Sequence, residues 1–272
     1  MWESILKTAT FRQSQITVLG TIINGSLGAL FYIFLARFLG PADFGLFTIA
    51  VTTMVLVADI ADIGTNTGIV RFVSANLAVN KDKAFKFLKL SLKIKLITWI
   101  ISFLTIFLLA PFLATEIFHK KELISPLRLA AFGIGGSLFF TFATSILQAY
   151  QKYFAWSIVN ILTNALRLLL ILVLGYLVIL NIESSLISYL VLPFFGFFVT
   201  FLFVPARKIF SSRNELSLVK EFLHYNVRVA AFTTVAAFSA KLDTYLTAVL
   251  LSTKEVGIYG ITNQLVAFIP QL

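Results

Sequence analysis

Arg167 is a single charge near the middle of a long apolar stretch. It is the only charged residue of segment 153–182 and lies 11 residues from both Trp156 and Val178, roughly 16 Å from either at helical rise. Polar residues precede it at spacings of 4, 3, 4 and 3, which place them on its helical face: Tyr153, Ser157, Asn160 and Asn164. A guanidinium donates two charge-assisted hydrogen bonds to a phosphate. The pattern predicts either a water-filled cavity for an anion or a polar contact between helices.

The composition indicates that such stretches cross a membrane. Hydrophobic residues make up 59% of the 272-residue chain and charged residues only 12%, against about 25% charged in soluble domains. A soluble fold needs a wettable surface, so the composition excludes a soluble enzyme, a nucleic-acid-binding protein and a disordered tail. The chain has no Cys and two His, which argues against disulfides and metal sites.

Eight stretches have the length and apolar character of membrane-spanning helices, which need about 20 residues. They cover residues 13–36, 44–66, 96–115, 129–151, 153–182, 184–206, 226–250 and 256–272. Apolar and polar residues do not alternate along them, which excludes an outer-membrane barrel. We therefore predict an all-α, multi-pass membrane protein with about eight transmembrane helices.

The distribution of Lys and Arg predicts the orientation. Fifteen of the 22 basic residues fall in segments 1–15, 71–95, 148–156 and 205–228, whereas five fall in the segments between the other helix ends. Basic loops stay on the cytoplasmic side. We expect a protein of the cytoplasmic membrane with its N-terminus in the cytoplasm.

The most basic of these segments is amphipathic. In segment 81–95, Lys86, Lys89 and Lys93 share one helical face, while Phe85, Leu88 and Leu92 share another. This pattern predicts an interfacial helix that leads into the third span. Specific capture of an anionic lipid headgroup is the alternative.

Charges inside the other spans mark further candidate sites, because a charged residue at mid-membrane costs at least about 2.5–3.5 kcal/mol. Asp59 and Asp62 share a face of the second span. Asp59 is a candidate partner for Arg167 or for a coupling cation, and Asp62 is expected at the membrane interface. Lys241 and Asp243 are two residues apart, so they point to different faces and at least one needs a partner elsewhere.

Two more residues complete the predicted cavity. Asn24 is a polar residue within the first span, and Arg37 is a basic residue on the predicted outer side. The positive-inside rule accounts for basic residues on the inner side but not for Arg37. Arg37 is therefore a stronger candidate for a functional role than an inner basic residue.

The chain contains a short internal repeat. Segment 38–47 (FLGPADFGLF) aligns with 250–259 (LLSTKEVGIY) at an offset of 212, which pairs Gly45 with Gly257 and Asp43 with Glu255. Because six helices separate the copies, the repeat is parallel, as in transporters built from two halves. We predict a six-helix lobe in residues 1–210 and the first two helices of a second lobe in 211–272. The chain is then expected to be incomplete.

Four segments in order resemble polysaccharide and oligosaccharide-lipid flippases of the multidrug/oligosaccharidyl-lipid/polysaccharide (MOP) exporter superfamily. They are LARFLGPADFGLFTIA (35–50), Asp62-Ile-Gly64 followed by Ile-Val-Arg71, LQAYQKY (147–153) and LDTYLTAVLLSTKEVGIYGI (242–261). The resemblance implies two MATE-like helical lobes around a central cavity. It also implies flipping of a polyprenyl-diphosphate-linked oligosaccharide from the inner to the outer leaflet by alternating access, for cell-surface polysaccharide synthesis.

On this interpretation the protein is a transporter and not an enzyme. It needs no cofactor, and coupling to a proton or sodium gradient stays open. The expected partners are a lipid-linked oligosaccharide and membrane lipids, with a polysaccharide polymerase and glycosyltransferases as candidates.

Other functions stay open at this point. A drug/cation antiporter or a peptidoglycan-precursor flippase belongs to the same superfamily. The antiporter is expected to have an acidic cavity, whereas the deepest charge here is Arg167. A membrane-embedded glycan polymerase or acyltransferase needs a polar catalytic loop or a His/Asp cluster, and a scaffold protein needs no polar face inside a span.

Overall fold

The computed structural model describes residues 9–212, 215 and 217–268, which are almost entirely helical and include no strand. The terminal segments 1–8 and 269–272, which belong to the two predicted lobes, lie outside the described residues. The predicted all-α fold is confirmed.

The helices follow one another with short connections. Their bounds are α2 Ala9–Ala61, α3 Thr65–Gly68, η1 Ile69–Val73, α4 Ser74–Leu77, α5 Lys81–Phe112, η2 Leu113–Ile117, η3 Lys121–Leu123, α6 Ile124–Ala149, α7 Tyr153–Tyr176, α8 Ile182–Thr200, α9 Ala206–Ser211, α10 Ser217–Leu250 and α11 Thr253–Phe268.

Five helices in the described part of the chain are long and apolar enough to cross a membrane. They lie within 13–61, 81–117, 121–149, 153–176 and 182–200. These lengths and compositions identify an integral membrane protein. The count of eight spans stays a prediction, since α10 and α11 are not among the five and α2 contains two of the predicted spans.

The helix α2 reverses direction at Gly40. Gly40 has φ 75° and ψ 169°, outside the helical region, and Pro41 follows it. Glycine reaches positive φ without a steric penalty, and proline suits the first turn of the next helix. The first and second predicted spans are therefore joined by a turn.

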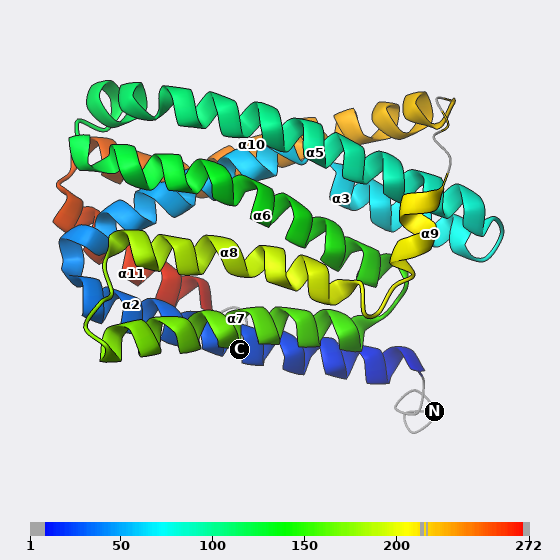
Figure 1. The fold of residues 1–272 in the computed structure, drawn as a ribbon, viewed down its shortest axis with the longest axis horizontal. Coiled ribbons are helices and arrows are strands. Elements are labelled where there is room, and N and C mark those ends of the chain that lie inside the picture. Colours follow the sequence, from blue (N-terminus) through cyan, green and yellow to red (C-terminus); the bar gives the residue numbers. More distant parts are fainter. Residues whose placement is uncertain (1–8, 213–214, 216, 269–272) are drawn as a thin grey trace.

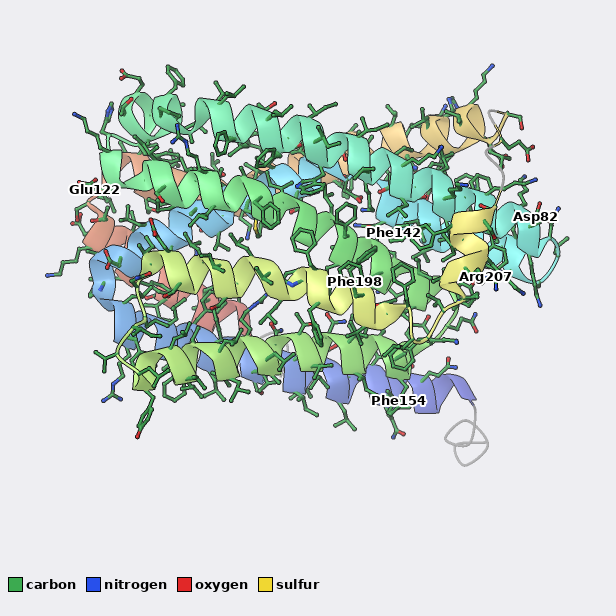
Figure 2. The ribbon with its side chains drawn as sticks, viewed as in Figure 1. Asp82, Glu122, Phe142, Phe154, Phe198 and Arg207 are labelled. Atoms are coloured by element: carbon green, nitrogen blue, oxygen red, sulfur yellow. The ribbon has the colours of Figure 1, made fainter. Side chains whose placement is uncertain are left out.

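The helices lie roughly side by side, and their connections gather at two ends (Figure 1). We call the end with the start of α5 and with α9 the basic end, and the end with the turns at Gly40, 118–120, 177–181 and 251–252 the hairpin end. In Figure 2, Asp82 and Arg207 lie at the basic end and Glu122 at the hairpin end. The ends are thus the polar parts of the molecule.

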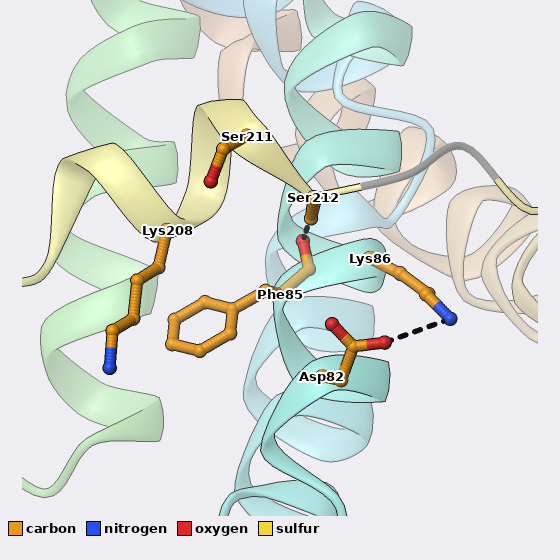
Figure 3. Close-up of a pocket in the computed structure, with 6 residues that line it drawn as sticks. All are labelled: Asp82, Phe85, Lys86, Lys208, Ser211 and Ser212. Carbon is orange, nitrogen blue, oxygen red and sulfur yellow. Dashed lines mark hydrogen bonds and ion pairs between the residues drawn. The ribbon is translucent and has the colours of Figure 1, made fainter.

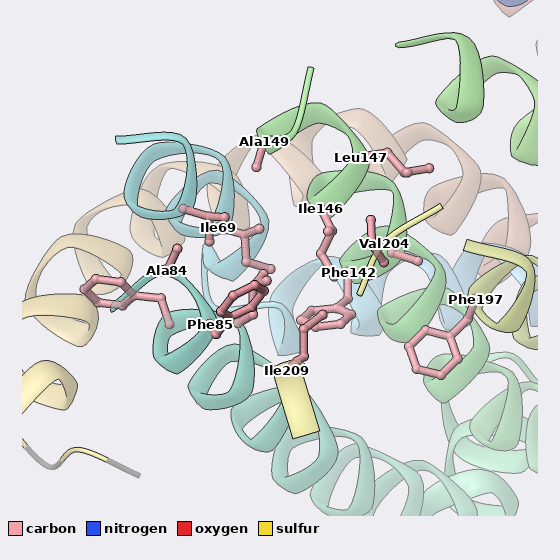
Figure 4. Close-up of a cluster of buried hydrophobic side chains, with 14 of the residues drawn as sticks. Ile69, Ala84, Phe85, Phe142, Ile146, Leu147, Ala149, Phe197, Val204 and Ile209 are labelled. Carbon is pink, nitrogen blue, oxygen red and sulfur yellow. The ribbon is translucent and has the colours of Figure 1, made fainter. Parts of the chain in front are cut away.

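The helix α5 joins the basic segment to the third predicted span without a break. Asn80 caps it by accepting a hydrogen bond from the Lys83 amide at 3.1 Å. Phe85 and Leu88 are buried in an apolar cluster that also contains Phe142 of α6 and Ile209 of α9 (Figure 4). The helical, amphipathic character predicted for residues 81–95 is confirmed.

The two copies of the sequence repeat pack against each other at the hairpin end. A β-carbon on Gly45 would lie 1.9 Å from the Thr253 carbonyl oxygen, and one on Gly257 would lie 1.9 Å from the Pro41 carbonyl oxygen. Pro41 and Thr253 are equivalent at the offset of 212. The contact is therefore reciprocal, as in an isologous interface.

Candidate functional site

Arg167 is held in a fixed position inside the bundle. Its Nη1 donates to Asn164 Oδ1 at 2.9 Å, one turn earlier on α7. Its guanidinium lies 3.9 Å from the ring centroid of Tyr189 on α8, and Nη2 is 3.4 Å from the Tyr189 carbonyl oxygen. Cation–π contact of this kind stabilises a partly desolvated guanidinium.

A cavity of 230 Å³ opens beside this arginine. Its lining comes from α2, α7 and α11: Asn24, Gly25, Gly28, Ala29, Tyr32, Asn164, Arg167, Gln264 and Ala267. Asn164 Nδ2 donates to Asn24 Oδ1 at 2.7 Å. The structure thus joins two sequence-predicted residues, Asn24 and Asn164, to Arg167 in one hydrogen-bonded chain.

Arg167 has no carboxylate partner among the described residues. The four ion pairs that these residues form all lie elsewhere, and Arg167 Nε is buried without a hydrogen bond. A cation removed from water is stabilised by a partner anion. The site therefore carries a positive charge that no carboxylate among the described residues neutralises.

The rest of the polar stripe on α7 serves different contacts. Ser157 is buried against α2, where a β-carbon on Gly20 would lie 2.3 Å from its hydroxyl oxygen. Asn160 Nδ2 donates to the Trp156 carbonyl at 2.8 Å. Tyr153 lines a separate cavity of 390 Å³ with Gln13, Ser14, Thr17 and Val18 of α2. Only Asn164 and Arg167 of the stripe line the Arg167 cavity.

Asp62 lies where the second predicted span breaks. The helix stops at Ala61, and Ile63 and Gly64 both have positive φ, 48° and 68°. Asp62 Oδ1 accepts from the Thr65 hydroxyl at 2.8 Å, and Oδ2 from the Asn66 amide at 3.2 Å. Its carboxylate thus caps the start of α3.

Asp62 also forms an ion pair with Lys95 of α5, which is fully buried. Lys95 was not among the predicted site residues, because it belongs to the basic segment 81–95. Helical periodicity could have identified it. At 100° per residue, Lys95 lies about half a turn away from the face of Lys86 and Lys89 and close to the apolar face of Leu88, which predicts a buried lysine.

Asp59 is exposed, and the charges that act on it are Lys241 of α10 and Asp62. The described residues show no ion pair between Asp59 and Arg167. Lys241 therefore lies close enough to act on Asp59 electrostatically, although the two side chains form none of the ion pairs found among the described residues.

A second missed residue, Asn226 of α10, packs into the same break. It is fully buried, and a β-carbon on Gly68 would lie 2.2 Å from its Oδ1. Neither Oδ1 nor Nδ2 has a hydrogen-bond partner in the part of the chain that the structure describes. No sequence pattern marks this contact, because it depends on how α10 crosses α3.

Asp243 and Arg37 lie nearer the hairpin end. Asp243 Oδ2 accepts from the Tyr259 hydroxyl at 2.5 Å and from Asn263 Nδ2 at 3.1 Å, both on α11. Arg37 is exposed beside the Gly40 turn. Neither residue lines the Arg167 cavity.

Solved structures with the same fold are transporters. The chain superposes on the MATE multidrug transporter DinF-BH, solved as a complex with a bound compound, with a TM-score of 0.75, 15% identity, and coverage of 96% of this chain and 60% of that one. It superposes on a MOP superfamily transporter from Pyrococcus furiosus with a TM-score of 0.66, 15% identity, and coverage of 95% and 64%.

The chain therefore spans 60% and 64% of the lengths of these two proteins, and at 15% identity the likeness concerns the fold. No curated protein sequence matches the chain. The family model described as "Polysaccharide biosynthesis protein" matches residues 11–272. With this match over nearly its whole length and a MOP-transporter fold, the chain belongs to the polysaccharide biosynthesis protein family.

Proposed function

We propose that this chain forms the first lobe, and the start of the second, of a transporter that flips a polyprenyl-diphosphate-linked oligosaccharide across the cytoplasmic membrane. Residues 1–210 form the first lobe and 211–272 begin the second. The basic end faces the cytoplasm, where the positive-inside rule puts it. The family match and the transporter fold support membrane transport in polysaccharide synthesis.

The observation that carries the substrate class is Arg167 without a carboxylate partner, among the described residues, beside a polar cavity. Arg167 is partly buried, and a charge removed in part from water is stabilised by a neutralising partner. A diphosphate is a suitable anion, because a guanidinium donates to it through two parallel hydrogen bonds. Asn164 and Tyr189 hold the arginine in place, so less conformational entropy is lost on binding.

The hairpin end supports alternating access. The Gly45–Gly257 contact brings the repeat copies together at that end, which corresponds to a closed outer side. In this state the substrate enters from the basic end or from the inner leaflet. In the opposite state of the transporter, Gly45 and Gly257 separate and the cavity opens at the hairpin end, on the outer side.

A drug/cation antiporter is the second candidate. Asp59 is exposed near Lys241, and Asp243 accepts hydrogen bonds from Tyr259 and Asn263. These carboxylates are the groups that a cation or a proton would use. They lie outside the Arg167 cavity, so in a flippase the same groups suit a coupling ion.

The decisive experiment replaces Arg167 in the natural gene and scores glycan export in cells that lack their own flippase. We expect Arg167→Ala to abolish export and Arg167→Lys to retain a part of it. Arg128→Gln is the control, because Arg128 lies over the Phe107 ring and lines a different cavity. Full export by Arg167→Ala at normal membrane levels would overturn the anion assignment, and efflux of a cationic dye would favour the antiporter.

A further inference from the structure

A second polar cleft lies at the basic end, away from the Arg167 cavity. Its volume is 550 Å³, and it lies between the first turns of α5 and the short helix α9 (Figure 3). The lining residues are Asp82, Phe85, Lys86, Lys208, Ser211 and Ser212. None of them lines the Arg167 cavity.

The cleft is built by specific contacts between its two walls. Lys89 Nζ donates to the Phe210 carbonyl at 3.0 Å and to the Ser212 carbonyl at 2.5 Å, which ties the end of α9 to α5. Ile209 is fully buried in the apolar cluster beneath. The two walls are therefore held together by the hydrogen bonds of Lys89 and by the apolar packing of Ile209.

Among the described residues of the cleft, one cation is without an ion pair or hydrogen bond. Lys86 pairs with Asp82 at 2.9 Å and with Glu215 at 3.0 Å. The Lys208 ammonium forms no ion pair or hydrogen bond with the described residues. Lys208 and the exposed Ser211 hydroxyl stand on the same wall (Figure 3). A phosphate accepts hydrogen bonds from both kinds of group.

Exposed apolar side chains lead to this cleft. Phe198 is 65% exposed, Leu202 81% and Phe210 52%. Aromatic contacts connect Phe210 to Phe198. The ring centroid of Phe201 lies 5.8 Å from that of Phe210 and 4.9 Å from that of Phe197, and the centroids of Phe197 and Phe198 are 5.2 Å apart. In a bilayer these side chains contact acyl chains, and the cleft lies where the headgroups are.

We propose that the α5–α9 cleft binds the headgroup phosphate of an anionic phospholipid of the phosphatidylglycerol type. Lys208 and Ser211 contact the phosphate. Lys86 also donates to it, through the N–H that does not pair with Asp82 or Glu215. The three cations Lys86, Lys89 and Lys208 outnumber the two carboxylates at this place, Asp82 and Glu215. The apolar approach favours a lipid over a soluble anion, because only acyl chains attached to the headgroup gain packing contacts with Phe198, Leu202 and Phe210.

The test is native mass spectrometry of the purified full-length protein titrated with phosphatidylglycerol or with phosphatidylcholine of the same acyl chains. We expect phosphatidylglycerol to bind more tightly. Lys208→Gln should weaken it about tenfold or more, since the phosphate loses a charge-assisted hydrogen bond from the ammonium. Lys208→Arg should restore it, and Ser211→Ala should weaken it in the same direction.

Arg207→Gln is the matched control, because Arg207 is exposed on the same helix one residue away and does not line the cleft. Equal losses in Arg207→Gln and Lys208→Gln would show general surface attraction and overturn the proposal. Phosphatidylcholine that binds as tightly as phosphatidylglycerol would overturn the proposal. Phosphatidylethanolamine that binds as tightly, with its ammonium paired to Asp82, would also overturn it. Inorganic phosphate that binds as tightly as the lipid would overturn the lipid assignment. Each readout is independent of glycan export, so this proposal and the flippase proposal fail separately.

Discussion

Gly45 of α2 and Gly257 of α11 lie backbone to backbone, each in the space that a side chain on the other would need. A β-carbon on either glycine would lie 3.1 Å from the amide nitrogen of the other. The two residues are equivalent in the sequence repeat, and so are Thr48 and Gly260, which also contact each other. The hairpin end is thus closed by a contact between equivalent residues.

Gly45→Ala is expected to destabilise this closure. The added carbon would meet the Thr253 carbonyl at 1.9 Å, and backbone cannot move aside as a side chain can. Overpacking of this kind costs about 1–3 kcal/mol or more, so the melting temperature of the purified protein should fall. Gly28→Ala is the control, since no atom of the described residues lies within 4 Å of its added carbon. Equal melting temperatures for the two variants would contradict the closure.

Asn164→Asp is expected to neutralise the candidate substrate site. The new carboxylate would replace the amide oxygen that accepts from Arg167 at 2.9 Å and form an ion pair with it. Loss of a charged hydrogen-bond partner lowers affinity about 10- to 100-fold, which export of the glycan would report. Asn160→Asp carries the same change on the same helix, but Asn160 bonds to Trp156, so export should persist. Inhibition by both variants would argue for a general effect of acidity.

The Asp62–Lys95 ion pair predicts a double-mutant pattern. Asp62→Asn or Lys95→Met alone leaves a buried group without its partner, which costs about 3–5 kcal/mol. The double variant removes both charges and should recover much of this loss. Yields of folded protein and melting temperatures test the pattern. Simple addition of the two single effects would exclude a coupled pair.

The Asn226 contact predicts a suppressor. Gly68→Ala places a carbon 2.2 Å from Asn226 Oδ1, and overpacking should lower stability by about 1–3 kcal/mol. Asn226→Ala removes the amide that obstructs the new carbon, so the double variant should be more stable than Gly68→Ala alone. A double variant no better than Gly68→Ala would show that the backbone causes the loss.

Glu255 predicts a pH dependence at the start of α11. The Ser252 hydroxyl donates to its Oε2 at 2.7 Å and the Ser252 amide at 2.9 Å, which together hold the pKa of Glu255 below its ordinary value of 4.5. A depressed pKa in the folded state stabilises the fold above the unfolded pKa, and this stabilisation is lost as pH falls through the folded pKa. Glu255→Ala should therefore lower the melting temperature at about pH 7, and the difference from the unchanged protein should vanish in acid. A difference that persists unchanged at acid pH would rule out the carboxylate as its source.

The class of protein, the helical face that Arg167 shares with Asn164, and the residues of the repeat all follow from the sequence. Long uncharged stretches specify membrane helices because lipid leaves the backbone no other partner for its hydrogen bonds. Helical periodicity placed Asn164 on the face of Arg167, and their 2.9 Å hydrogen bond follows from that spacing. The pairing of Gly45 with Gly257 was present in the alignment as an equivalence, although nothing in it required that they touch.

The contacts between helices, in contrast, come from the three-dimensional packing. Asn24 bonds to Asn164 across 140 residues, and Lys95 reaches Asp62 across 33. Periodicity specifies which face of a helix is polar, but not which neighbour that face contacts, because helix packing depends on the shapes of both surfaces. The same reason explains why Ser157 lies against Gly20 although it shares a face with Arg167, and why the buried amide of Asn226 gave no signal in the sequence.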